Sequence, residues 1–165
     1  MKKALLAAVL VLTGYGTAVP ASGDQQRLLG AWRFVREVDT KGNGSPAPAA
    51  AMSDCEGLLV YAPDGYMAVN IVPKGRKWSA GTATLDEMRE TIGNGTSYVG
   101  RYEIDAAAQT VTHVVSISVD PAFQNKRLTR KYAFEGETLK LSGTFVFNGE
   151  TIRFVITWER AGRPG

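Results

Sequence analysis

Short runs of strand-forming residues, separated by tight turns, fill this chain from residue 28 onward. The clearest turns are Ala62-Pro63-Asp64-Gly65 and Asn148-Gly149. Proline presets φ in the first turn and its glycine accepts a positive φ, while Asn-Gly is the preferred type I′ hairpin dipeptide. Because turns this short join antiparallel neighbours, the pattern predicts an all-β chain wound from consecutive hairpins.

The strand-forming runs number eight, and we expect them at residues 28–38, 57–61, 66–72, 98–104, 110–119, 128–134, 138–147 and 151–160. Eight antiparallel strands in up-and-down order can close into a barrel, whose interior holds side chains or one small ligand. An open sandwich is the alternative, but its Greek-key crossovers need longer late connections than these. The predicted fold is therefore an all-β, eight-stranded antiparallel up-and-down barrel.

One short helix interrupts the predicted strands. Thr84-Leu85-Asp86-Glu87 has the spacing of a capping box, and Leu85, Met88 and Ile92 recur at i, i+3 and i+7. We expect this helix to cover one end of the barrel with its apolar stripe, as a lid or a plug. Residues 39–54 are rich in glycine, proline and alanine, which predicts a long, mobile first loop.

Residues 1–21 have the order of a secretory signal peptide: Lys2 and Lys3, then an apolar run over 4–12, then small residues up to Ala21. The run is shorter than the roughly 20 residues that span a bilayer. We expect cleavage after Ala21 and a single domain over residues 22–165. The Lys-Lys start is typical of bacterial export to the periplasm or the medium. After cleavage we expect no stable insertion of the mature chain into a membrane. An uncleaved membrane anchor is the alternative.

Charge and composition exclude several classes of function. The 165 residues fit one domain, and the net charge of +3 includes Lys2 and Lys3, so the mature chain is nearly neutral. That argues against a nucleic-acid partner, which needs a clustered basic face. Cys55 is the only cysteine, which excludes an internal disulfide and favours a small buried side chain over a reactive thiol. With only one histidine as well, we expect no metal site and no cofactor.

The single histidine, His113, is predicted to point into the barrel. It shares its alternation with four aliphatic residues: Val111, Val115, Ile117 and Val119. An imidazole titrates near neutrality and can act as acid or base, but no aspartate, serine or cysteine lies at a spacing that would build a nucleophile system. We interpret His113 as a hydrogen-bonded interior residue rather than a catalytic one.

Arg130 gives the most informative prediction. By alternation it faces inward with Leu128, Tyr132 and Phe134, whereas no acidic residue of the strands is expected inside. An unpaired buried guanidinium is costly and requires a carboxylate or an anionic ligand. The alternative is that Arg130 pairs with an acidic side chain near the barrel end, or that a β-bulge shifts the alternation. Our hypothesis is that the polar head of an apolar, fatty-acid-like ligand is bound by Arg130, His113, Tyr98, Tyr102 and Tyr132.

Five motifs carry a family resemblance: Gly30-Ala31-Trp32-Arg33-Phe34-Val35, the run from Gly57 to Met67, Gly100-Arg101-Tyr102-Glu103-Ile104-Asp105, Thr110-Val111-Thr112-His113 and Trp158-Glu159-Arg160. In order and spacing the chain resembles the lipocalin-like domain of many bacterial and fungal proteins, over residues 28–160. The resemblance implies a calycin-type barrel in which Trp32, preceded by Gly30, packs near Arg160 and closes one end. It implies no universal catalytic set. By alternation, Trp32, Phe34 and Val38 share one face of the first strand.

We therefore expect an exported protein that binds a small hydrophobic ligand inside its barrel. One alternative is an isomerase or cyclase that acts on a hydrophobic metabolite in the same pocket, with His113 or a tyrosine moving a proton. Another is a barrel that binds a protein, for example as an inhibitor, through its long first loop. The first two predict an interior cavity, and the third predicts a filled barrel. The oligomeric state stays open.

Overall fold

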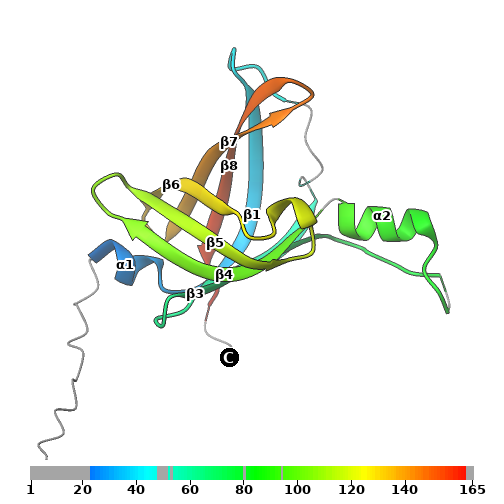
Figure 1. Ribbon diagram of the computed structural model, residues 1–165, viewed down its shortest axis with the longest axis horizontal. Helices are drawn as coiled ribbons and strands as arrows, with labels where there is room; N and C mark the ends of the chain where they lie inside the picture. Colours follow the sequence, from blue (N-terminus) through cyan, green and yellow to red (C-terminus); the bar gives the residue numbers. More distant parts are fainter. Residues whose placement is uncertain (1–22, 48–51, 53, 80, 94, 163–165) are drawn as a thin grey trace, which may run out of the picture.

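A computed structural model describes residues 23–162, apart from 48–51, 53, 80 and 94. Eight strands pair in sequence order, and β8 returns to β1 to close a barrel (Figure 1). Every pair is antiparallel, so the predicted up-and-down barrel is confirmed and the open sandwich is wrong. The strands are β1 Gly30–Lys41, β2 Cys55–Tyr61, β3 Tyr66–Pro73, β4 Thr96–Asp105, β5 Thr110–Ser118, β6 Arg127–Glu135, β7 Thr138–Phe147 and β8 Glu150–Arg160.

The predicted turns join these strands. Gly65 has a φ of 86° and donates its N–H to the Ala62 carbonyl at 3.1 Å, which closes the β2–β3 hairpin. Asn148 and Gly149 have φ values of 49° and 80°, as a type I′ turn between β7 and β8 requires. After β5, Asp120 accepts the N–H of Ala122 at 2.8 Å and begins the short 3-10 helix η1, Pro121–Phe123.

A short helix, α1 (Gly23–Leu28), precedes the barrel and lies at one of its ends, which we call the closed end (Figure 1). The sequence predicted a strand from residue 28, but β1 begins at Gly30 because Leu28 ends this helix. Leu28 is fully buried, and its carbonyl accepts the indole N–H of Trp32 at 2.7 Å. The predicted signal peptide, residues 1–21, lies outside the described residues.

Trp32 and Arg160 meet at this closed end, as the resemblance implies. The guanidinium lies 3.9 Å from the centroid of the Trp32 ring, and its Nη1 donates to the Leu29 carbonyl at 2.5 Å. Gly30 has a φ of 104°, and a Cβ there would lie 3.3 Å from Nη1 of Arg160. A glycine is therefore required at this position both by the backbone and by the arginine packed against it.

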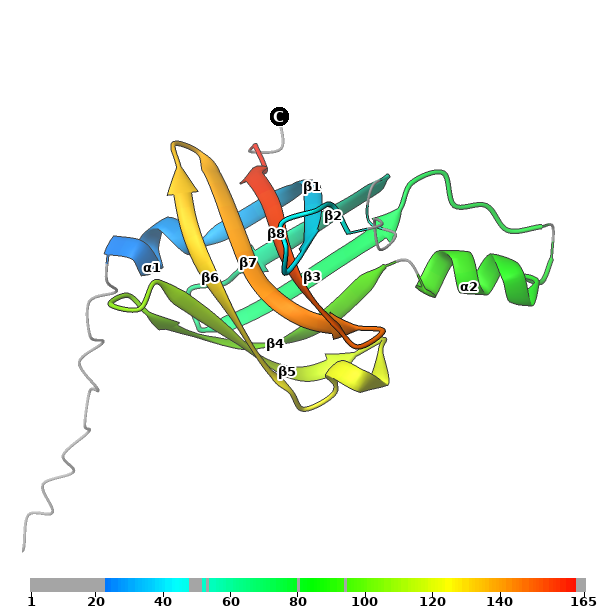
Figure 2. The ribbon, with the colours of Figure 1, turned by 90° about the horizontal axis from the view of Figure 1, so that it is seen from above.

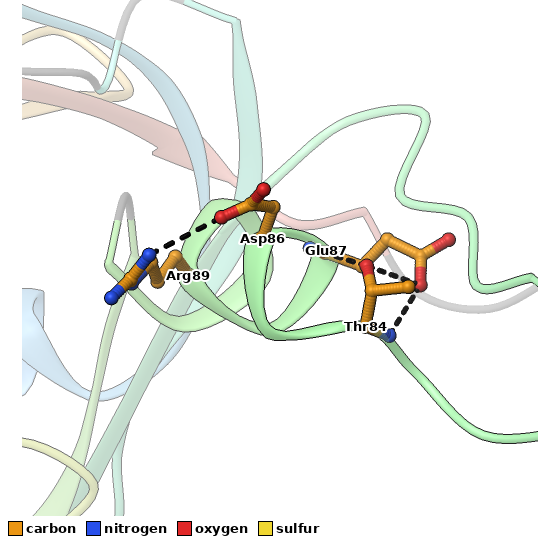
Figure 3. Close-up of polar contacts among 4 residues, drawn as sticks. All are labelled: Thr84, Asp86, Glu87 and Arg89. Atoms are coloured by element: carbon orange, nitrogen blue, oxygen red, sulfur yellow. Dashed lines mark hydrogen bonds and ion pairs between the residues drawn. The ribbon is translucent and has the colours of Figure 1, made fainter.

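The inserted helix α2 spans Leu85–Gly93, and its capping box is formed as predicted (Figure 3). Thr84 donates its backbone N–H to Glu87 at 2.7 Å, and the N–H of Glu87 is donated back to the Thr84 hydroxyl at 3.2 Å. Hydrogen bonds to the Glu87 carboxyl, first from the Ser79 hydroxyl and then from the backbone N–H groups of Thr84 and Ser79, lower its pKa to about 2. In the described part of the chain, no helix is both long and apolar enough to span a membrane.

The expectation that α2 covers an end of the barrel is wrong. The helix lies at the opposite end from α1 but projects to the side, beyond the ends of β3 and β4 (Figure 2). Its apolar residues Leu85 and Ile92 are 58% and 55% exposed. Ser79, in the connection before the helix, donates its backbone N–H at 2.7 Å and its hydroxyl at 2.6 Å to the Glu87 carboxylate. The start of the helix is therefore bonded to the segment that precedes it rather than to the barrel.

A β-bulge in β1 changes which residues face inward. The register with β8 passes from Phe34 opposite Trp158 to Arg36 opposite Thr157, so Val35 is the extra residue. Beyond it, Glu37 and Asp39 take the inner face and Val38 is turned outward, against the prediction for Val38. The strand then continues to Lys41, and Thr40 bridges Pro46, so the first loop is shorter than residues 39–54.

A second bulge lies in β5. Val99 faces Ile117 while Gly100 faces Val115, which leaves Ser116 as the extra residue. The alternation predicted Ile117 and Val119 to be inside with His113, but they are 67% and 57% exposed. The inward prediction therefore holds for the part of β5 before the bulge and is wrong after it.

Candidate ligand-binding cavity

The barrel contains a cavity of about 630 Å³ in the half away from Trp32 and Arg160. Its size lies within the roughly 300–1,000 Å³ of small-molecule sites. Most of the lining is apolar, and examples from different strands are Leu59, Val69, Ile71, Leu141, Phe154 and Ile156. Charged side chains, threonine hydroxyls and His113 interrupt these apolar walls.

His113 of β5 lies on the wall of the cavity, with 1% of its surface exposed. Its Nε2 is 2.7 Å from the Tyr61 hydroxyl and its Nδ1 is 2.8 Å from the Tyr98 hydroxyl. Burial, together with the charge of Arg130, holds the pKa of His113 well below its usual range. The ring is therefore neutral, so one tyrosine donates to it and the other accepts from it.

These contacts leave no free nitrogen on His113 for acid or base chemistry. Both tyrosine hydroxyls have raised pKa values because they are buried, so they also stay protonated. Of the two, Tyr98 lines the cavity and Tyr61 does not. Sequence reasoning missed Tyr61, although its alternation with Leu59 along β2 is a signal that could have found it.

The structure does not bring Tyr102 and Tyr132 to the cavity wall. Tyr102 donates its hydroxyl to the Ala62 carbonyl at 3.0 Å, at the β2–β3 turn. Tyr132 donates to the Asp24 carboxylate on α1 at 2.8 Å, and burial with that carboxylate raises the pKa of Tyr132 to about 12. Both tyrosines face inward as predicted, but they tie the closed end of the barrel together.

Arg130 of β6 lines the cavity, as its alternation predicts. Its Nη1 donates to the Leu128 carbonyl at 3.0 Å. The guanidinium lies 6.0 Å from the centroid of the Tyr98 ring and 5.8 Å from that of Phe154. Arg130 and the Tyr98–His113 pair are thus the predicted site residues that the fold brings together.

Two carboxyl groups, Glu37 and Asp39, also line the cavity. The expectation that no acidic strand residue faces inward is wrong, because the bulge at Val35 reverses the alternation of β1. Burial raises the pKa of Glu37 to about 7; the charge of Asp39 and a hydrogen bond between the two carboxyl groups add to this increase, and the charge of Arg130 opposes it. Burial also raises the pKa of Asp39. No glycine or proline marks this bulge, so the sequence carries no clear signal for it.

Three buried polar atoms have no hydrogen-bond partner among the described residues: Glu37 Oε2, Asp39 Oδ1 and Trp158 Nε1. All three residues line the cavity, and they lie on adjacent strands, since Phe34 faces Trp158, Glu37 faces Ile156 and Asp39 faces Phe154. We call Glu37, Asp39 and Trp158 the polar wall. Native interiors rarely leave such atoms unpaired, so the polar wall is the part of the cavity best suited to a polar group of a ligand.

Two further predictions concern cysteine and metals. Cys55 at the start of β2 is buried, which confirms its interpretation as a tucked-away side chain, and burial raises the pKa of its thiol. Over the described ranges, no three histidine, cysteine, aspartate or glutamate side chains gather closely enough to hold a metal ion.

Comparison with known proteins agrees with this architecture. The family model described as the lipocalin-like domain matches residues 29–161, which include all eight strands of the barrel. No curated protein matches the chain. With the family model covering most of the sequence and eight strands closed around an interior cavity, the chain belongs to the lipocalin-like domain family.

Proposed function

We propose that this protein binds a small, largely apolar molecule inside its barrel. The observation that carries the proposal is the cavity of about 630 Å³, whose walls are mostly aliphatic and aromatic. Transfer of an apolar ligand into such a space removes apolar surface from water at both partners, which favours binding. A few polar side chains at fixed positions would orient the bound molecule.

The cavity favours this function over a barrel that only binds proteins. That alternative requires a filled interior, in which side chains from opposite strands meet at native packing density. Here His113 and the aliphatic side chains of β2, β3 and β7 instead border open volume. The interior is therefore better suited to a guest molecule than to structural packing alone.

Arg130 supports the anionic head group expected from the sequence, because its guanidinium borders the cavity. Glu37 and Asp39 border the same space and carry the opposite charge. The apolar body of the ligand and the charge of its head are therefore separate parts of the proposal, and they need separate tests.

We also propose that the barrel acts outside the cytoplasm. This rests on the sequence pattern of residues 1–21, a basic start followed by an apolar run and small residues. Expression in a bacterial host tests it: the exported protein is expected to begin at Ser22. Recovery of the intact chain from the cytoplasm alone would contradict export.

Photo-crosslinking tests where a hydrophobic ligand binds. A dodecyl chain that carries a diazirine is expected to label peptides with cavity-lining residues, such as Val69 of β3 and Leu141 of β7. Labelling confined to the exposed apolar residues Leu85 and Ile92 of α2 would instead indicate surface adsorption and would contradict an interior site.

A further inference from the structure

We propose that the ligand is an amphiphilic amine, whose protonated nitrogen is bound by the Glu37 and Asp39 carboxyl groups of the polar wall. This inference rests on the proposed binding function of the cavity and specifies the chemical class of its ligand. It reverses the charge of the head group expected from the sequence, because the bulge in β1 places these carboxyls inside.

The first observation in favour of an amine is the position of the two carboxyl groups. Glu37 and Asp39 are successive inward residues of one strand, on either side of the outward Val38. Each has a buried oxygen with no hydrogen-bond partner in the described part of the chain. Once both groups are ionised, as at pH 8, their oxygens only accept hydrogen bonds, so a bound group must donate to them. An ammonium group has several donors and can reach both oxygens.

The second observation in favour of an amine is the balance of charges around the cavity. Two arginines also line it, but Arg127 is paired with Glu103 at 2.5 Å on the exposed outer face. Arg130 is left to balance both Glu37 and Asp39, and one of its nitrogens already donates to the Leu128 carbonyl. A ligand carboxylate would add a third negative charge to this space, whereas an ammonium group compensates the second carboxyl.

Trp158 is a third, independent observation at the same wall. Only 1% of this residue is exposed, and its Nε1 has no hydrogen-bond partner among the described residues. It lies on β8 opposite Phe34, one inward position from the Glu37–Ile156 pair and two from the Asp39–Phe154 pair, and lines the cavity with its ring edge-to-face to Phe34 at 5.7 Å. An indole N–H donates only, so it fits an oxygen of the ligand. Amines with a nearby hydroxyl or carbonyl oxygen therefore match all three atoms.

The next strands along the barrel, β2 and β3, offer a place for the rest of the ligand. Leu59 of β2, with Val69 and Ile71 of β3, offers only aliphatic surface. A ligand with its nitrogen at the polar wall would lay its apolar body against these residues. This arrangement favours a molecule with one basic end over a polyamine, whose further charges would have no carboxyl partner there.

Three ligands with the same chain and different heads test the charge. Dodecylamine, dodecan-1-ol and dodecanoate are titrated at pH 8 against the protein loaded with the neutral fluorescent probe N-phenyl-1-naphthylamine. We expect dodecylamine to displace the probe at a concentration about tenfold or more below that of dodecanoate, the scale of one charge-assisted hydrogen bond. Glu37→Gln with Asp39→Asn should abolish this preference and leave dodecan-1-ol unchanged.

Two further variants complete the test. Glu56→Gln removes an exposed carboxyl of β2 that pairs with Arg76, and should leave the preference intact. Arg130→Met should strengthen dodecylamine relative to dodecanoate, so it tests the charge even where the double carboxyl variant does not fold. Equal displacement by all three ligands, or a preference for dodecanoate, would overturn the amine while the binding function stands. If the probe does not bind to the wild-type protein, the binding function itself fails.

Discussion

The Arg160 guanidinium lies 3.9 Å from the centroid of the Trp32 ring and donates to backbone carbonyls of Leu29 and Arg27. These contacts fasten α1 and the start of β1 to the end of β8. Arg160→Met should therefore lower the free energy of unfolding by about 2 kcal/mol, through lost cation–π and charged hydrogen bonds. Urea denaturation measures this change.

Arg33→Met is the matched control, since Arg33 lies on the same strand as Trp32 but is exposed and pairs with Glu159 on the outer face. Its effect should stay below about 0.5 kcal/mol, as for other surface ion pairs. If Arg160→Met abolished probe binding without loss of stability, Arg160 would belong to the binding site rather than to the closure of the barrel.

The hydrogen bonds of His113 give the second prediction. His113→Phe would leave the Tyr61 hydroxyl buried without its partner, so we expect a loss of about 2–4 kcal/mol. Tyr98→Phe removes the bond to Nδ1 and a contact with Arg130, while the bond between Tyr61 and Nε2 remains, so it should cost about 1–2 kcal/mol. Urea unfolding of both variants compares them; equal, negligible losses would show that the Tyr61–His113–Tyr98 contacts do not stabilise the fold.

The carboxyl of Glu37 predicts a pH dependence of stability. Its pKa is raised from 4.5 to about 7, so the folded state holds this proton more tightly and stability falls as pH rises from about 4.5 to 7. Its charged neighbours inside the barrel are Asp39 and Arg130, and Cys55 lies close enough to be affected by its charge. Partial exposure of Glu37 limits the effect to about 2 kcal/mol.

His113 acts in the opposite direction, because its lowered pKa removes stability as pH falls below 6.5. The two groups therefore offset each other in the wild-type protein. Glu37→Gln should expose the histidine contribution as a steeper loss of stability below pH 6.5, measured by urea unfolding at a series of pH values. Superimposable pH profiles of variant and wild type would contradict the assignment of Glu37.

The apolar residues of α2, Leu85, Met88 and Ile92, are exposed, so we expect this helix to contribute little to the stability of the barrel. Ile92→Ala should change the free energy of unfolding by less than about 0.5 kcal/mol, as expected for a surface position. The same substitution at Ile71, which is buried on β3, should cost about 2–5 kcal/mol. A large loss at Ile92 would show that α2 packs on the barrel in solution.

Turns and helix ends whose structure depends on residues adjacent in the sequence were predictable. The Asn148-Gly149 turn and the Thr84–Glu87 capping box follow from the chemistry of two to four adjacent residues, and both are formed. The order of the strands followed from the connections between them, most of which are short. Local chemistry therefore defined the barrel, including the inward direction of His113 before the β5 bulge.

The chemistry of the cavity was less predictable, because it depends on the pairing between strands. The bulges at Val35 and Ser116 arise from the register with β8 and β4. Neither bulged strand has a glycine or proline at the extra residue, although Gly100 of β4 lies against the bulge at Ser116. Each reverses the alternation beyond it, which brings Glu37 inside and puts Ile117 outside. Tyr102 and Tyr132 were predicted to contact the ligand but lie away from the cavity wall, because alternation tells which face a residue takes, but not how far along the barrel it lies.

The most direct test of an interior ligand site is a titration of N-phenyl-1-naphthylamine into wild-type protein and two tryptophan variants. Val69→Trp places a large ring in the cavity, whereas Val38→Trp adds the same ring on the outer face of β1. With cooperative unfolding retained in both, we predict that Val38→Trp binds the probe like the wild type and that Val69→Trp loses about tenfold or more in affinity. Equal affinity of all three proteins would place the ligand outside the barrel and contradict the proposed function.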